Sequence, residues 1–146
     1  MVTKRSLLLV ALCSLALEAC SRESGGGGPK RQRESNPASV GFIDFPKEGA
    51  IVDSPVAVSG WALDESGVRL VRIYFDDELM VSAAPASVRR DVEQRYPERR
   101  TQDGVHGFDA VINAGSHSGY TLIRAEVIDE KGGLTSVYSV TVKIKE

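Results

Sequence analysis

Apolar and polar residues alternate along most of residues 40–146. A period of two places apolar side chains on one face of a strand and polar side chains on the other, as a half-buried antiparallel sheet requires. The last such run is the clearest, because Tyr138, Val140, Val142 and Ile144 alternate with serine, threonine and lysine. The predicted strands are 41–45, 56–61, 71–76, 79–83, 106–113, 123–128 and 138–145.

Turn-forming sequences separate these runs. They occur at Pro46–Gly49, Asp64–Gly67, Ser118–Gly119 and Glu130–Gly133, where glycine, proline and aspartate favour reversal of the chain. About seven short strands in about 105 residues predict an all-β fold, an immunoglobulin-like antiparallel β-sandwich. A small open barrel is the alternative.

One segment, residues 87–96, departs from this alternation. Val88, Val92 and Tyr96 recur every four residues, which is the spacing of one helix face, and Pro97 follows. We therefore predict a short inserted helix near 87–96, followed by a loop over 98–105. Long connections in a compact sandwich often carry function.

The N-terminus has the pattern of a secretory signal. Lys4 and Arg5 precede an uncharged run over 6–17, which is shorter than the about 20 apolar residues of a membrane-spanning helix. The following Leu17-Glu18-Ala19-Cys20 resembles the lipobox of bacterial lipoproteins, although Glu18 departs from its usual small residues.

The lipobox resemblance implies cleavage between Ala19 and Cys20 and acylation, including palmitate, at Cys20. In Gram-negative lipoproteins a residue such as Ser21 at the next position implies transfer to the outer membrane. We accordingly predict a signal peptide over 1–19, a lipidated Cys20 with a flexible linker over 20–39, and a folded domain over 40–146. Several acyl chains hold a small domain on a bilayer, since each buried methylene contributes about 0.8 kcal/mol.

The linker and the domain differ in charge. Residues 21–39 contain Gly25–Gly28 and no large apolar residue, and such a chain reaches roughly 25 Å. A basic cluster at 30–33 is either a soluble spacer or a contact with anionic lipid or peptidoglycan. Residues 40–146 hold 12 Lys+Arg and 17 Asp+Glu, and this excess of acidic residues disfavours nucleic-acid binding.

The folded part resembles a bacterial immunoglobulin-like domain over most of residues 41–146. The resemblance rests on Gly-Trp-Ala-Leu-Asp at 60–64, Arg-Asp-Val at 90–92, Tyr-Pro at 96–97 and Gly-Phe at 107–108. Such domains are accessory or stalk modules of extracytoplasmic bacterial proteins. The resemblance implies no set of catalytic residues.

An arginine cluster in the predicted insertion is the candidate ligand site. A guanidinium group pairs bidentately with carboxylates, sulfates and phosphates. We expect Asp91 to accept a bond from an arginine or from a backbone donor and to pin the helix to the sandwich. The alternative is a solvated helix face. The candidate anion-binding residues are Arg89, Arg90, Arg95, Arg99 and Arg100.

Two aromatic residues have contrasting predicted roles. Trp61, the single tryptophan, is expected to anchor the core, with sugar stacking as the alternative. Tyr74 alternates onto the outer face of its strand and is the candidate exposed aromatic contact.

The sequence favours neither a metal site nor catalysis. Asp64 and Asp129 at strand ends are weak candidate calcium ligands, but no EF-hand spacing is present and solvated turn carboxylates are the favoured interpretation. His106 and His117 fall on different predicted elements, and no hydrolase, zincin or P-loop motif occurs. We predict no cofactor and no enzyme.

The expected function is that of a membrane-anchored, non-catalytic binding or structural module of the cell envelope. Its expected partner is another envelope protein or a surface polysaccharide, and not a nucleic acid. A carbohydrate- or calcium-binding module and a small extracytoplasmic hydrolase are the alternatives.

Overall fold

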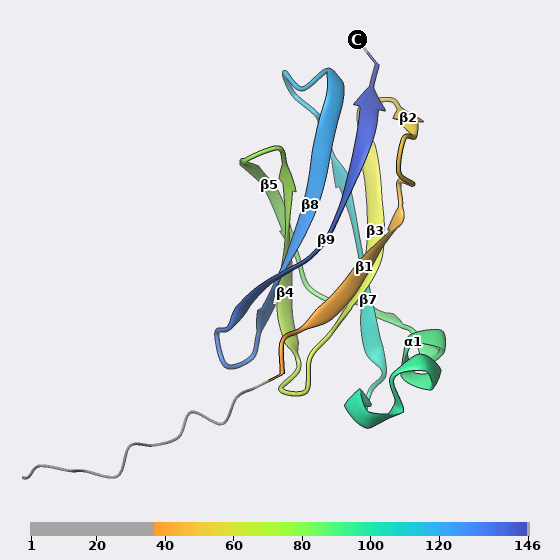
Figure 1. Cartoon of the computed structure of the whole chain (residues 1–146), viewed down its shortest axis with the longest axis vertical. Coiled ribbons are helices and arrows are strands. Elements are labelled where there is room, and N and C mark those ends of the chain that lie inside the picture. The colour runs from red at the N-terminus through yellow and green to blue at the C-terminus, as the bar shows by residue number, and fades with distance from the viewer. Residues whose placement is uncertain (1–36, 146) are drawn as a thin grey trace, which may run out of the picture. The chain divides into compact units, whose positions relative to one another are not determined.

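Two β-sheets pack face to face in residues 37–145, the part of the chain that this computed structural model describes (Figure 1). All strand pairs are antiparallel except β2 (Ile51–Val52) with β9 (Leu134–Ile144). The first sheet has the order β1 (Val40–Phe45), β3 (Val56–Leu63), β7 (Val105–Ile112), β6 (Ser87–Val88). The second has the order β2 (Ile51–Val52), β9 (Leu134–Ile144), β8 (Gly119–Asp129), β4 (Val68–Phe75), β5 (Glu78–Ala83).

This strand order is that of an immunoglobulin-like sandwich. The first, second, fifth and fourth strands of that fold form one sheet, and β1, β3, β7 and β6 take these places. After β1 the chain crosses to the second sheet, where β2 runs parallel to β9. The predicted all-β, immunoglobulin-like sandwich is confirmed, and the alternative of an open barrel is wrong because the strands form two separate sheets.

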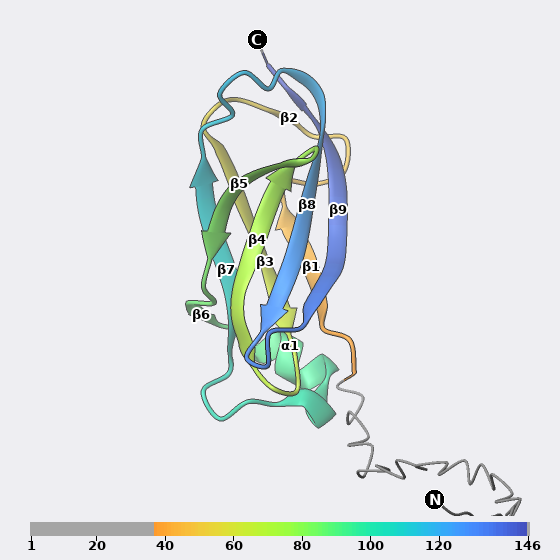
Figure 2. The ribbon, with the colours of Figure 1, turned by 90° about the vertical axis from the view of Figure 1, so that its left-hand side faces the viewer.

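The main core lies between the sheets and consists of the inward residues of the predicted alternation. Ile73, Phe75 and Ile123 are fully buried, as are Val140 and Val142 on the neighbouring strand. Full burial of each such side chain contributes roughly 1.5–3 kcal/mol. The core therefore comes from the period-two pattern that predicted it. Figure 2 shows the two sheets one behind the other.

The strand boundaries differ in places from those predicted. All seven predicted strands are present, and β4, β8 and β9 start three or four residues earlier than expected. The strands β2 and β6 were not predicted, because two residues are too few to show alternation. Both are defined by pairing with a distant strand, β9 or β7.

The predicted helix over 87–96 is wrong in its first turn. The helix α1 spans only Arg90–Arg95, and a 3-10 turn, η1 (Pro97–Arg99), lies in the predicted loop. Ser87 and Val88 belong instead to β6, flanked by backbone hydrogen bonds from Ala86 N to Gly107 O (2.8 Å) and from Arg89 N to Gly104 O (3.0 Å). These bonds to a distant segment replace the local ones of a helix. Val88 is consequently 52% exposed rather than part of an apolar helix face.

A second, smaller apolar cluster lies on the outer face of the first sheet, beneath α1. Along β3, Val58 and Ala62 face the main core, while Trp61 and Leu63 face outward against Val92 of α1. Trp61 is buried, as expected, but it anchors this outer cluster rather than the core between the sheets. The insertion therefore supplies the apolar cover that the outward tryptophan needs.

Within residues 37–145, we find no helix with the length and hydropathy needed to cross a bilayer.

Candidate functional site

A cavity of about 530 Å³ opens beside α1, where the edge of the first sheet faces the edge of the second. We call it the Arg89 groove. Its volume lies within the roughly 300–1,000 Å³ typical of small-molecule sites. The groove is lined by Ser39, Val40, Gly41, Phe42, Asp44, Trp61, Arg89, Asp91, Arg95, Tyr96, Ser136 and Val137.

Two strand edges form the walls of the groove. β1 is the outermost strand of its sheet, and β9 pairs with β2 only at Lys143 and Ile144, so the earlier part of β9 is also an edge. Gly41 of β1 lies close to both β3 and β9, because an added Cβ would lie 2.7 Å from the Trp61 carbonyl oxygen on β3 and 3.0 Å from Val137 on β9. Glycine is required there because the two strands leave no room for a side chain.

The Arg89 side chain is fixed in the groove by two carboxylates. Its Nε and Nη2 donate to the two oxygens of Asp91 (2.9 and 2.8 Å), and its Nη1 donates to Asp44 Oδ2 (2.6 Å). The hydrogen bond from Arg89 lowers the pKa of Asp91 to about 2. The hydrogen bonds that Arg89 donates to Asp91 and Asp44 raise the pKa of Arg89, against the opposing effect of burial. Arg89 and Asp91 therefore stay ionised over the physiological pH range.

This network confirms that Asp91 accepts an arginine bond. The polar connection from Asp91 to the sandwich runs through Arg89, because its guanidinium joins Asp91 at the start of α1 to Asp44 on β1. Asp44 is 45 residues away from Arg89 along the chain. No local signal in the sequence identified it as the partner.

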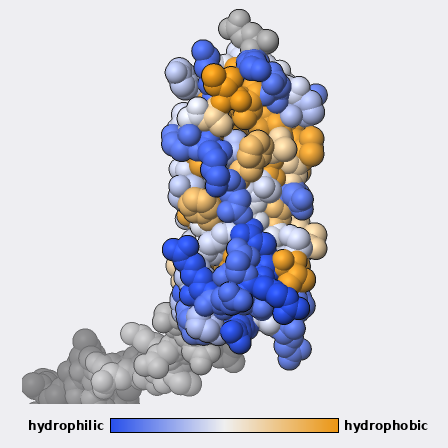
Figure 3. Space-filling model, turned by 90° about the vertical axis from the view of Figure 1, so that its right-hand side faces the viewer, coloured by the Kyte–Doolittle hydropathy of each residue, from blue (hydrophilic) through white to orange (hydrophobic). Residues whose placement is uncertain are grey.

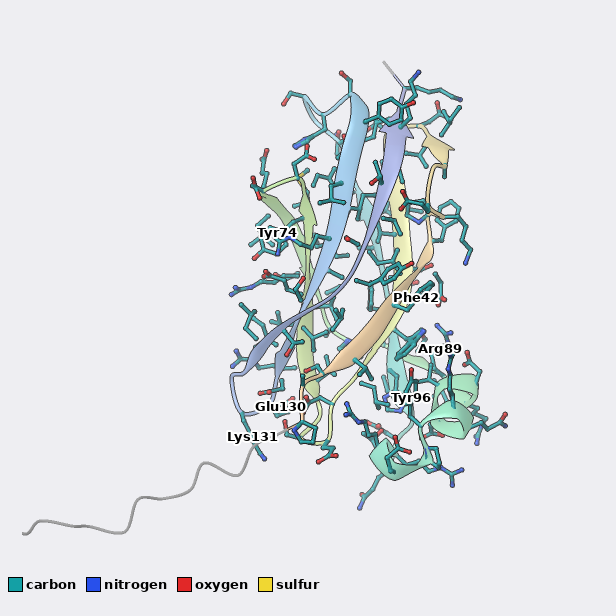
Figure 4. All side chains as sticks on the ribbon, in the orientation of Figure 1. Phe42, Tyr74, Arg89, Tyr96, Glu130 and Lys131 are labelled. Carbon is teal, nitrogen blue, oxygen red and sulfur yellow. The ribbon has the colours of Figure 1, made fainter. Side chains whose placement is uncertain are left out.

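Aromatic rings flank this ion network. Tyr96 packs against Trp61 with 5.6 Å between ring centroids, and Phe42 packs against Tyr138 at 4.1 Å. Phe42 and Tyr96 are half-buried. Figure 4 shows Arg89 between Phe42 and Tyr96, with α1 below. Sequence analysis missed both Phe42 and Tyr96 as site residues; their aromatic character was the available signal, but only the fold brings them together.

The five candidate arginines do not converge on one site. Arg89 and Arg95 line the groove, and the Arg95 guanidinium lies 5.9 Å from the Tyr96 ring. Arg99 instead donates to the backbone oxygen of Ala38 (3.0 Å), which ties η1 to the start of the domain. The exposed Arg90 and Arg100 are not among the groove-lining residues. Anion binding by this set stays a prediction.

Tyr74 lies far from the groove, on the outer face of the second sheet (Figure 4). Its ring is half-buried beneath the Arg124 guanidinium, 4.3 Å from the ring centroid. Arg124 in turn pairs with Glu126. Tyr74 and the groove are therefore separate surfaces.

The candidate calcium ligands Asp64 and Asp129 are buried and hold turns. Asp64 accepts hydrogen bonds from the Ser39 hydroxyl (2.8 Å) and from the backbone and hydroxyl of Ser66. Asp129 accepts one from Gly133 N (2.8 Å). Among residues 37–145, no three acidic, histidine or cysteine side chains are grouped so as to hold a metal ion.

The two histidines occupy different parts of the domain. His106 is 2% exposed, with Nε2 3.7 Å from a carboxylate oxygen of Glu93 on α1 and 3.5 Å from Thr101 Oγ1. His117 follows β7, and its Nδ1 lies 3.0 Å from the Ala114 carbonyl oxygen. His106 thus packs against the insertion, while His117 belongs to a separate turn.

Comparison with known proteins yields a structural likeness only. No family model matches the chain, and neither does any curated protein. Among solved structures, it is similar to the fibronectin(III)-like modules of Clostridium thermocellum CbhA, with 18% sequence identity and a TM-score of 0.48. The likeness covers 73% of this chain and 96% of that chain.

Proposed function

We propose that this protein is a lipid-anchored lipoprotein of the bacterial cell envelope that displays one non-catalytic immunoglobulin-like module, and that the module binds its partner at the Arg89 groove. The observation that carries the binding role is the groove itself, in which Arg89 is already fixed by Asp44 and Asp91. A site whose polar groups are positioned before binding loses little entropy when the ligand arrives.

The proposed anchor rests on the Leu-Glu-Ala-Cys sequence at 17–20 and on the apolar run before it. Residues 1–36, which include Ala19, Cys20 and most of the predicted linker, lie outside the described structure. In this proposal, the outer membrane holds the acylated Cys20 and the linker carries the domain.

The proposed anchor and the groove are close along the chain. Ser39, the last residue of the predicted linker, and Val40, the first of the predicted domain, line the groove, and the Ser39 hydroxyl donates to Asp64. A linker of about 19 residues has a reach of roughly 25 Å. We therefore propose a partner in the envelope layer next to the membrane, either another envelope protein or a surface polysaccharide.

The anchor is tested by intact-mass measurement of the protein from native membranes, beside a Cys20→Ala variant. We expect a chain that begins at Cys20 and carries acyl mass, and loss of that mass in the variant. A soluble product without acyl mass would contradict the anchoring and leave a secreted module.

The binding role is tested by capture of envelope components on the full-length protein and on groove variants. Ser136→Trp is designed to fill the groove from an exposed position on β9, while Tyr74→Leu alters the outer face of β4, away from the groove. We expect loss of the captured component with Ser136→Trp and retention with Tyr74→Leu. Equal capture by both variants would contradict binding at the groove.

A further inference from the structure

The charges in the Arg89 groove cancel. Arg89 and Arg95 contribute two positive charges, and Asp44 and Asp91 contribute two negative ones. Arg89 is already bonded to both carboxylates. An anionic ligand would meet these carboxylates, and a cationic ligand would meet the guanidinium groups. Because an unbalanced charge is costly to place in a partly desolvated site, the groove favours a neutral ligand.

The groove also presents a hydrogen-bond donor next to an acceptor. The three bonds to Asp91 and Asp44 use three of the five guanidinium N–H groups of Arg89, which leaves one on each Nη. Asp44 is 36% exposed and receives Arg89 on Oδ2, and the second oxygen of a carboxylate can accept a further bond. A hydroxyl group both donates and accepts. Two neighbouring hydroxyls therefore match this pair, one accepting from Arg89 and the other donating to Asp44.

Apolar surface lies on both sides of these polar groups. Phe42 and Tyr96 are half-buried, and the buried Trp61 reaches the floor of the groove. Sugar rings combine apolar C–H faces with hydroxyl edges. Their faces pack on aromatic rings while their edges meet fixed polar groups, which is the combination that small-molecule sites offer.

We propose that the Arg89 groove binds a neutral saccharide, with its hydroxyls on Arg89 and Asp44 and a ring face against Tyr96 or Phe42. This inference rests on the proposed function, since it names the ligand class of the same groove. It also replaces the expectation of an anionic ligand at Arg89, because two carboxylates already balance that guanidinium.

The test is binding of the full-length, detergent-solubilised protein to an array of neutral glycans and of sulfated or uronic glycans, with calorimetry on the best of them. We expect binding to neutral glycans, weakened at least about tenfold, or about 1.4 kcal/mol, by Asp44→Ala and by Tyr96→Leu. Tyr74→Leu is the matched control because it alters an aromatic residue on the other sheet.

Asp44→Ala and Tyr96→Leu also remove contacts of the fold, so Ser136→Trp provides the independent test. Its exposed site on β9 lets the fold remain while the side chain obstructs the groove, and an unchanged thermal unfolding midpoint verifies this. Loss of neutral glycan binding in this variant supports the proposal. Neutral glycan binding that Ser136→Trp leaves intact overturns the groove as the saccharide site.

The remaining outcomes separate this inference from the proposed function. Binding of only sulfated or uronic glycans, blocked by Ser136→Trp, overturns the neutral class and keeps the groove as a binding site. Capture of an envelope protein that Ser136→Trp abolishes, without binding of any glycan, likewise overturns the saccharide ligand and keeps the groove as a binding site. No binding of any glycan and no groove-dependent capture overturns both proposals.

Discussion

The same strands form both halves of the outer face of the first sheet, but the apolar side chains are buried in one half and exposed in the other. Near α1, the outward Trp61 of β3 is only 8% exposed, because Val92 and Tyr96 of the insertion cover it. Farther along the same sheet, Val111 of β7 is 72% exposed and Phe45 of β1 is 47% exposed. Figure 3 shows the hydrophilic surface of the lower half below the hydrophobic residues of the upper half.

This difference shows what the insertion adds to the sandwich. The alternation along β3 and β7 brings apolar residues outward in both halves, but only the lower half receives a covering element. That cover buries a tryptophan outside the main core and leaves the Arg89 groove at its margin. The proposed ligand site therefore belongs to the covered half.

Among the substitutions that test the difference between the halves, Trp61→Ala is expected to cause the largest loss of stability. Removing a buried tryptophan costs about 3–5 kcal/mol of unfolding free energy, through lost burial and a cavity under α1. Urea unfolding followed by circular dichroism measures this loss. The control Val111→Ala, in the bare half of the same sheet, is expected to change stability by less than about 0.5 kcal/mol. Similar losses in the two variants would contradict the distinction between the halves.

Gly107→Val tests the approach of the insertion to the sheet. A Cβ on Gly107 would lie 2.1 Å from Ser87 Oγ and 3.2 Å from Arg89 Cγ, so a larger side chain must push β6 and Arg89 away. Overpacking of this kind costs about 1–3 kcal/mol. Chemical denaturation provides the measurement, with Ala57→Val on the exposed part of β3 as the matched enlargement. We expect Ala57→Val to be close to neutral, and a comparable loss there would count against a specific contact at Gly107.

Asp44→Asn tests the ion network that joins the insertion to β1. Arg89 and Asp44 are 24% and 36% exposed, whereas Lys145 and Asp53 form an ion pair that is 56% and 72% exposed. Partial burial limits screening, so we expect Asp44→Asn to cost about 1 kcal/mol, against a few tenths for Asp53→Asn. Thermal and urea unfolding of both variants measure which substitution causes the larger loss of stability. A larger loss for Asp53→Asn would reverse this ranking.

The sequence predicted the sandwich and the presence of an insertion because both follow from local patterns. Alternation in a run such as 138–144 depends only on neighbouring residues, and the apolar residues of this run form the inward face of β9 in the structure. The helical spacing of Val88, Val92 and Tyr96 was a weaker guide. It predicted a helix turn where pairing with β7 imposes strand.

The groove was less predictable, because its parts come from distant places in the chain. The arginine cluster indicated the insertion, but it did not show that Arg89 pairs with Asp44 on β1 or that Arg99 contacts the backbone of Ala38. Alternation correctly placed Tyr74 on an outer face. Trp61 was expected in the core, but it lies on the outer face of β3, and the position of α1 decides that it is buried there.

The smallest expected effect concerns the pH dependence of the covered half. Arg89 lowers the pKa of Asp91 to about 2 in the folded protein, mainly through its hydrogen bond, whereas an unfolded aspartate titrates near 3.9. A lowered folded pKa means that the stabilisation is fully present above pH ~4 and is lost as the pH falls toward ~2.

The difference in unfolding free energy between the protein and Asp91→Asn isolates this contribution. We expect that difference to be constant above about pH 5 and to shrink steadily as the pH falls from about 4 to about 2. It stays small because the Asp91 side chain is 66% exposed and solvent screens the pair. In an Arg89→Ala background, the same substitution is expected to lose its pH dependence in this range, since the group that lowers the pKa is gone. If the difference in unfolding free energy still depends on pH in that background, a group other than Arg89 lowers the pKa of Asp91, which would contradict the proposed role of the Arg89–Asp91 pair.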